Sequence, residues 1–90
     1  MDLYTVLLEY LGGTYVGQVR ASSVSIALTA WLDQLDVENV SGLTASAKDA
    51  LRAGSEQDNP VKVQGCENAW CWTKVQGQNL VLVNIVKTAE

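Results

Sequence analysis

The feature that most constrains the fold is a run of alternating side chains on both sides of two glycines, "LYTVLLEYLGGTYVGQVRA". Period-two alternation is typical of β-strands, and a glycine pair takes the positive φ of a two-residue hairpin turn without strain. We therefore predict strands over residues 3–11 and 14–21, with Gly12 and Gly13 forming the turn. The chain then starts with a β-hairpin.

This turn predicts a register in which Leu11 pairs with Thr14. One face of the hairpin then carries nonpolar and tyrosine side chains throughout: Tyr4, Val6, Leu8, Tyr10, Tyr15, Gly17, Val19 and Ala21. We expect this face to lie in the core, because a one-sided nonpolar face fixes which side of a sheet is buried. The opposite face is mixed, with Leu7 and Val16 among polar residues.

The segment after the hairpin carries the strongest helix signal in the chain. Its apolar residues recur at helical spacing: Val24, Ala27, Leu28, Trp31, Leu32 and Leu35. Ser22 and Ser23 are suitable N-caps at its start. The pattern predicts an amphipathic helix that buries one stripe, with Trp31 in the core.

A second, shorter helix is predicted after an irregular segment over residues 37–43. Thr44 or Ser46 is expected to cap it, and Gly54 is expected to end it as the C′ residue after Ala53. Pro60 then directs the chain into an extended conformation. The second helix is therefore predicted to be confined to residues between Thr44 and Gly54.

The last third of the chain has the pattern of three strands, over residues 61–66, 70–76 and 79–87. The final turn is either Gln76-Gly77 or Gly77-Gln78. Both choices place the tryptophans on the face of the last strand's β-branched residues: Trp70, Trp72, Val81, Val83 and Ile85. The other face then includes Leu80 and Leu82.

The element order is β-β-α-α-β-β-β, and 90 residues supply one hydrophobic core. Runs of strands and helices in this order predict an α+β fold, with a mainly antiparallel sheet and both helices packed on one face. We expect residues 1–90 to form a single two-layer domain. The order of the strands in the sheet stays open.

Composition excludes several classes of function. The chain has no histidine, which removes the commonest general base and metal ligand. Its net charge of −4 disfavours nucleic-acid binding. We predict no catalytic residues, metal or cofactor. With no apolar run of roughly 20 residues and no signal-peptide pattern after Met1, we expect a cytoplasmic protein that does not enter a membrane.

The segment "CENAWCW" brings two cysteines and two tryptophans together. Cys66 and Cys71 are expected to lie opposite each other across a hairpin. Their spacing matches neither a Cys-x-x-Cys redox site nor a zinc site, so small buried thiols are the favoured interpretation. A reactive thiol at either cysteine, next to Trp70 and Trp72, is the alternative.

The aromatic residues offer a second set of candidate binding residues. Trp70 and Trp72 are expected to pack in the core or at an interface, and a partner that docks there would use them as anchors. Tyr10 and Tyr15 line the core face of the first hairpin, where a small ligand pocket is the weaker alternative to simple packing.

The function predicted from these patterns is that of a small non-enzymatic interaction module. Two helices cover only one face of the sheet, and both hairpins have apolar residues on the other. We expect a homodimer or higher oligomer that uses Leu7, Val16, Leu80 and Leu82, with another protein as a further possible partner. A ligand-binding protein or thiol-dependent enzyme that uses Cys66 or Cys71 is the alternative.

Overall fold

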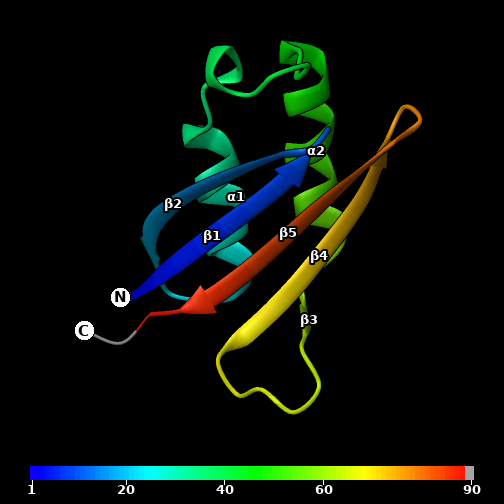
Figure 1. Cartoon of the computed structure of the whole chain (residues 1–90). Coiled ribbons are helices and arrows are strands. Elements are labelled where there is room, and N and C mark those ends of the chain that lie inside the picture. The colour runs from blue at the N-terminus through cyan, green and yellow to red at the C-terminus, as the bar shows by residue number, and fades with distance from the viewer. Residues whose placement is uncertain (89–90) are drawn as a thin grey trace.

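The structure, a computed structural model, describes residues 1–88 as a five-stranded antiparallel sheet with two α-helices on one side (Figure 1). The elements are β1 (Asp2–Tyr10), β2 (Gly13–Ala21), α1 (Val24–Gln34), η1 (Val37–Asn39), α2 (Ala45–Gln57), β3 (Val61–Lys62), β4 (Ala69–Gln76) and β5 (Asn79–Lys87). The predicted α+β fold and element order are confirmed.

The strands lie in the order β2-β1-β5-β4-β3. The last strand, β5, pairs with β1, so the two hairpins join edge to edge in one sheet. The central strands β1 and β5 contribute the most completely buried side chains of the sheet, including Val6, Leu8, Val83 and Ile85. The strand order, which the sequence left open, therefore places the most apolar strands in the middle.

The first turn differs from the prediction. Tyr10 pairs with Gly13, so the turn residues are Leu11 and Gly12, with φ of 48° and 80°. Leu8 pairs with Tyr15, although the predicted register paired Leu8 with Gly17. Each partner shifts by two residues, so every side chain keeps its predicted face.

Packing against α1 accounts for this shift. In the observed register Gly17 pairs with Val6, and the indole of Trp31 lies directly over Gly17, where an added Cβ would overlap Nε1. Local turn chemistry favours glycine at both turn positions, and the left-handed conformation of Leu11 costs about 1–2 kcal/mol. The close contact between helix and strand outweighs that cost.

Helix α1 agrees with its predicted pattern. Ser23 is the N-cap, and its hydroxyl accepts a hydrogen bond from the N–H of Ile26 at 3.3 Å. The stripe Ala27, Leu28, Trp31 and Leu32 is buried against the sheet. Trp31 is only 5% exposed, which confirms its place in the core.

Helix α2 is longer than predicted. Thr44 caps it, as one alternative proposed, but Gly54 does not end it and instead lies buried inside the helix. The side chain of Lys74 packs over Gly54, and an added Cβ would lie 3.2 Å from Lys74 Cε. Gly54 thus lets α2 approach β4, and the helix stops at Asp58, two residues before Pro60.

The final strands have the predicted faces but different lengths. The expected strand over 61–66 shortens to β3, because the chain turns after Val63. Gln76 pairs with Asn79, which makes Gly77-Gln78 the last turn, one of the two alternatives. Trp72 pairs with Val83 and shares its buried face, as predicted.

Candidate functional site

The candidate site is the side of the sheet that the helices leave uncovered, called here the helix-free face. The strand registers define it through the outward residues that pair across the sheet. It consists of Leu3, Thr5, Leu7, Glu9, Thr14, Val16, Gln18, Arg20, Val61, Ala69, Cys71, Thr73, Val75, Leu80, Leu82, Asn84 and Val86.

The helix-free face carries little charge. Only Glu9 and Arg20 are charged among these described strand positions, although the whole chain has 16 charged residues. The charges concentrate instead on the helices and their connections, where Arg52 pairs with Asp33 and with Glu56. An outer sheet face is usually clearly polar, so this face is unusual for a surface that meets only water.

The four residues predicted to line a contact all lie on this face. Leu7 and Val16 pair directly across β1 and β2, and Leu80 and Leu82 follow on β5. Val16 is 61% exposed and Leu80 is 57% exposed, while Leu7 and Leu82 are half-buried by their neighbours. The four side chains therefore share one face over three adjacent strands, where Asn84 pairs with Leu7 and Glu9 pairs with Leu82.

The polar residues near the middle of the helix-free face bind one another. The side-chain amide of Gln18 donates to the Thr5 hydroxyl at 3.1 Å, and Thr5 shares a hydrogen bond with the hydroxyl of Thr88. This chain of contacts crosses β2, β1 and the end of β5. These groups keep hydrogen-bond partners even if water is removed, which lowers the cost of burying the face.

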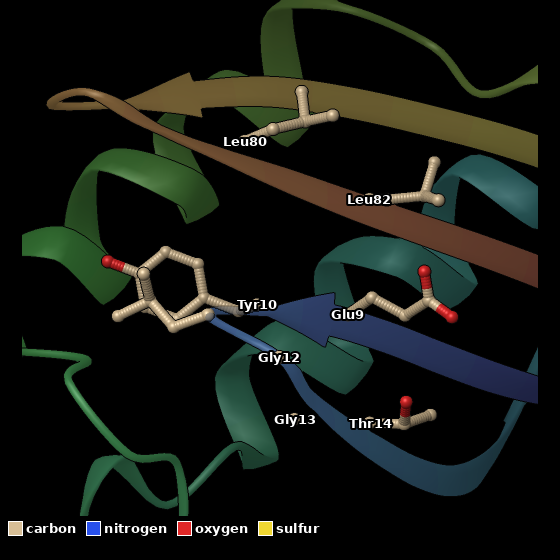
Figure 2. Close-up of a pocket in the computed structure, with 8 residues that line it drawn as sticks. Glu9, Tyr10, Gly12, Gly13, Thr14, Leu80 and Leu82 are labelled. Carbon is tan, nitrogen blue, oxygen red and sulfur yellow. The ribbon is translucent and has the colours of Figure 1, made fainter.

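A shallow hollow of about 370 Å³ lies at the turn end of this face (Figure 2). Glu9 lies between Thr14 on β2 and Leu82 on β5, its direct cross-strand neighbours. Tyr10, Leu80 and the turn residues 11–13 complete the lining. The hollow thus combines apolar sides with one carboxylate, an arrangement suited to a cationic group on an aliphatic stem.

The prediction that Cys66 and Cys71 lie opposite each other across a hairpin is wrong. Cys71 lies on β4 opposite Val61, while Cys66 lies in the turn after β3, where its N–H donates to the Val63 carbonyl at 3.1 Å. Both thiols are free, and Cys66 is exposed, so the prediction of two buried thiols is also wrong for Cys66. The early turn at Val63 separates them, because it moves Cys66 out of the ladder.

The aromatic candidates lie on the helix-covered side of the sheet. Trp72 is 3% exposed, and its indole N–H donates to the Asp58 carbonyl at 3.1 Å. Trp70 packs edge-on against Tyr4, with ring centroids 6.1 Å apart. The structure therefore places these side chains in the packing between the sheet and the segments that cover it.

The two tyrosines also have structural contacts. Tyr10 is buried in the core, and the half-buried Tyr15 accepts a hydrogen bond from the Ser41 N–H at 3.1 Å through its hydroxyl. This bond ties β2 to the segment that precedes α2. Tyr10 also lines the hollow beside Glu9.

Other chemical signals are weak in the described part of the chain. Within residues 1–88, no group of three acidic or cysteine side chains is arranged to hold a metal ion, and no helix is long and apolar enough to cross a membrane. The Arg52 guanidinium donates hydrogen bonds to the carboxylates of Glu56 and Asp33, and these bonds raise the pKa of Arg52. This cluster joins α1 to α2 and has a structural role.

Sequence reasoning placed the polar residues of the first hairpin, Glu9 and Arg20 among them, on this face, but it missed how far the face extends. Val75 and Val86 extend it across β4 and β5, with exposed fractions of 65% and 40%. Their alternation with buried neighbours was visible, but the strand order decides that these residues continue the surface around Leu80. Comparison with known proteins finds no matching family model, curated protein or solved structure for this chain.

Proposed function

We propose that this protein is a self-associating interaction module and that two copies pack through their helix-free faces. The observation that carries the proposal is the composition of that face, which is apolar and almost uncharged although no element of the described chain covers it. Depletion of charge distinguishes the centres of protein interfaces from other surfaces. A sheet face of this kind is suited to packing against a second sheet.

The size of the face supports a second copy as the partner. Four strands contain eight or nine residues each. At about 4.8 Å between strands and about 3.3 Å per residue, they cover roughly 19 by 28 Å, or about 530 Å². Two copies would cover roughly 1,100 Å² as flat area, and side-chain relief brings this near the about 1,200–2,000 Å² of stable interfaces.

The chemistry of the face also supports self-packing. Its apolar residues outnumber its polar ones, and the side chains of Gln18, Thr5 and Thr88 hydrogen-bond one another. These three side chains can therefore be buried against an identical face without losing all their hydrogen-bond partners. An isologous dimer uses the same surface twice, so one such face per chain is sufficient.

The test is a double substitution, Leu7→Asp with Leu82→Asp, studied by sedimentation velocity. We expect the natural protein to form dimers and the double variant to be a folded monomer, because buried carboxylates without partners oppose association. The matched control is Ile26→Asp, which places a charge on an apolar residue of α1 that is 53% exposed. A folded double variant with the same mass as the natural protein would contradict the proposal.

A further inference from the structure

We infer that Asn84 lies on the two-fold axis of the pair, so that its side-chain amide hydrogen-bonds the same amide of the second copy. This inference rests on the proposed function, and it names the residue that fixes how the two helix-free faces align. It depends on the position of Asn84 in the sheet and on the chemistry of its side chain.

Asn84 lies at the middle of the helix-free face. It belongs to β5, the third of the five strands in the order β2-β1-β5-β4-β3 (Figure 1). It pairs with Leu7 on β1 and with Cys71 on β4. Along β5, the nearest residues on the same face are Leu82 and Val86. Asn84 is therefore a polar side chain with four apolar neighbours, since a free cysteine behaves as a small apolar residue.

The Asn84 amide has no hydrogen-bond partner among residues 1–88, whereas Gln18 and Thr5 on the same face bond each other. The residue is half-buried, so the amide of a single chain is open to water. Packing of two faces removes that water. Burial of an amide without a partner opposes association, so the opposite face has to present a donor and an acceptor at this point.

A second Asn84 presents both groups. An asparagine side chain has a carbonyl acceptor and an NH₂ donor, so two facing amides can donate to each other. In an isologous pair, a residue faces its own copy at the two-fold axis. Packed sheets lie about 10 Å apart. Each amide nitrogen lies three bonds from its Cα, so two asparagines joined by a hydrogen bond of about 2.9 Å span this gap.

This contact fixes one alignment of the two faces. If one face slides over the other, each amide moves from the partner amide onto an apolar neighbour such as Leu7 or Leu82, and both amides lose their partners. A buried asparagine specifies the register of coiled coils for the same physical reason. Asn84 is therefore a specificity-determining residue of the interface.

The experiment uses Asn84→Asp and Asn84→Lys, each purified alone and then mixed in equal amounts, with affinities measured by sedimentation velocity. Each variant alone brings like charges together at the axis, and we expect the dissociation constant to rise roughly tenfold or more. In the mixture opposite charges meet at the axis. The mixed pair should therefore bind at least about tenfold more tightly than either variant alone.

The matched control makes the same two substitutions at Thr73, an exposed position of β4 on the same face. Thr73 lies away from the axis and does not face its own copy. A mixture of Thr73→Asp and Thr73→Lys should therefore bind no more tightly than the stronger of the two variants alone. Recovery at position 84 without recovery at position 73 supports the inference.

A second measurement does not depend on the folding of the charged variants. Asn84→Cys, in a chain that also carries Cys66→Ser and Cys71→Ser, is treated with a short thiol-specific cross-linker. We expect efficient joining of two copies, and weaker joining when Thr73→Cys replaces Asn84→Cys.

The outcomes separate the inference from the proposed function. If the natural protein dimerises but mixing at position 84 gives no recovery, or position 73 cross-links more efficiently than position 84, the axis lies elsewhere and the proposed function stands. If the natural protein is a monomer at every concentration, the proposed function fails, and the inference fails with it.

Discussion

The two faces of the sheet differ in what covers their apolar side chains. Leu7 and Leu8 are neighbours on β1 with identical side chains, yet Leu8 is 1% exposed under the helices while Leu7 lies on the helix-free face. The helix-covered face joins strands and helices in one core that includes Leu28, Leu51 and Ile85. The helix-free face has apolar residues without an equivalent cover.

The core of the single chain draws on one face of the sheet. The core cluster draws on both helices and on the four long strands, and Leu7, Val16, Leu80 and Leu82 are not part of it. Apolar residues that stabilise no core in the single chain require another physical role. The association that we propose would give them one, because burial against a second copy removes the same kind of surface from water.

The largest expected contrast comes from truncating the two neighbouring leucines separately. Leu8→Ala should lower the free energy of unfolding by about 2–5 kcal/mol, because it leaves a cavity in the core. Leu7→Ala should lower it by less than about 1 kcal/mol when the chain is monomeric. Urea unfolding at low protein concentration measures both. Equal losses would show that the two faces do not differ in the folded chain.

A smaller effect on stability is expected where Trp31 of α1 packs over Gly17 of β2. Gly17→Ala would add a Cβ beneath the Trp31 indole and should destabilise the chain by about 1–3 kcal/mol through overpacking. The neighbouring Gln18→Ala, on the helix-free face, is the control and should change stability less. Thermal unfolding followed by circular dichroism compares them, and a neutral Gly17→Ala would mean that Trp31 does not pack this closely.

Loss of the hydrogen bond between Thr29 on α1 and Ser55 on α2 should lower the free energy of unfolding by about 1 kcal/mol. Ser55 is 3% exposed, and its hydroxyl donates to the Arg52 carbonyl and bonds the Thr29 hydroxyl at 2.9 Å. Ser55→Ala removes this contact between α1 and α2 and should lower stability by about 0.5–1.5 kcal/mol. The exposed Ser41→Ala is the control. Denaturant midpoints distinguish the two variants, and identical midpoints would contradict a stabilising role for the Ser55 hydroxyl.

The smallest effect should appear in the reactivity of the cysteines. Cys71 lies on the helix-free face and Cys66 lies in an exposed turn outside it. Dimer formation should slow alkylation of Cys71 by several-fold as protein concentration rises, because reagents need access to the sulfur. Mass spectrometry of alkylated peptides reports both sites together, with Cys66 as an internal control. A parallel response at both cysteines would place Cys71 outside the contact.

Much of the fold could be predicted, because period-two and helical patterns report which residues are buried. The stripe of α1 and the faces of both hairpins follow from local spacing. The register of the first hairpin could not be predicted, because the fit of Trp31 over Gly17 involves a helix that is distant along the chain. The position of Gly54 inside α2 could not be predicted for the same reason, because the Lys74 side chain that covers it comes from β4, which is distant along the chain.

The candidate site could be predicted only in part. Leu7, Val16, Leu80 and Leu82 share a face because of strand alternation, and their closeness depends on the pairing of β1 with β5, which no local pattern encodes. The separation of Cys66 from Cys71 depends on an early turn at Val63, which shortens a strand that the pattern predicted to continue.

The most direct test of self-association is the mass of the unmodified protein in solution, measured by size-exclusion chromatography with light scattering over a concentration series. We predict a rise with concentration from the 9.7 kDa of one chain to twice that value, with or without reductant. A mass that stays at 9.7 kDa at every concentration, or that doubles only without reductant, would contradict association through the helix-free face.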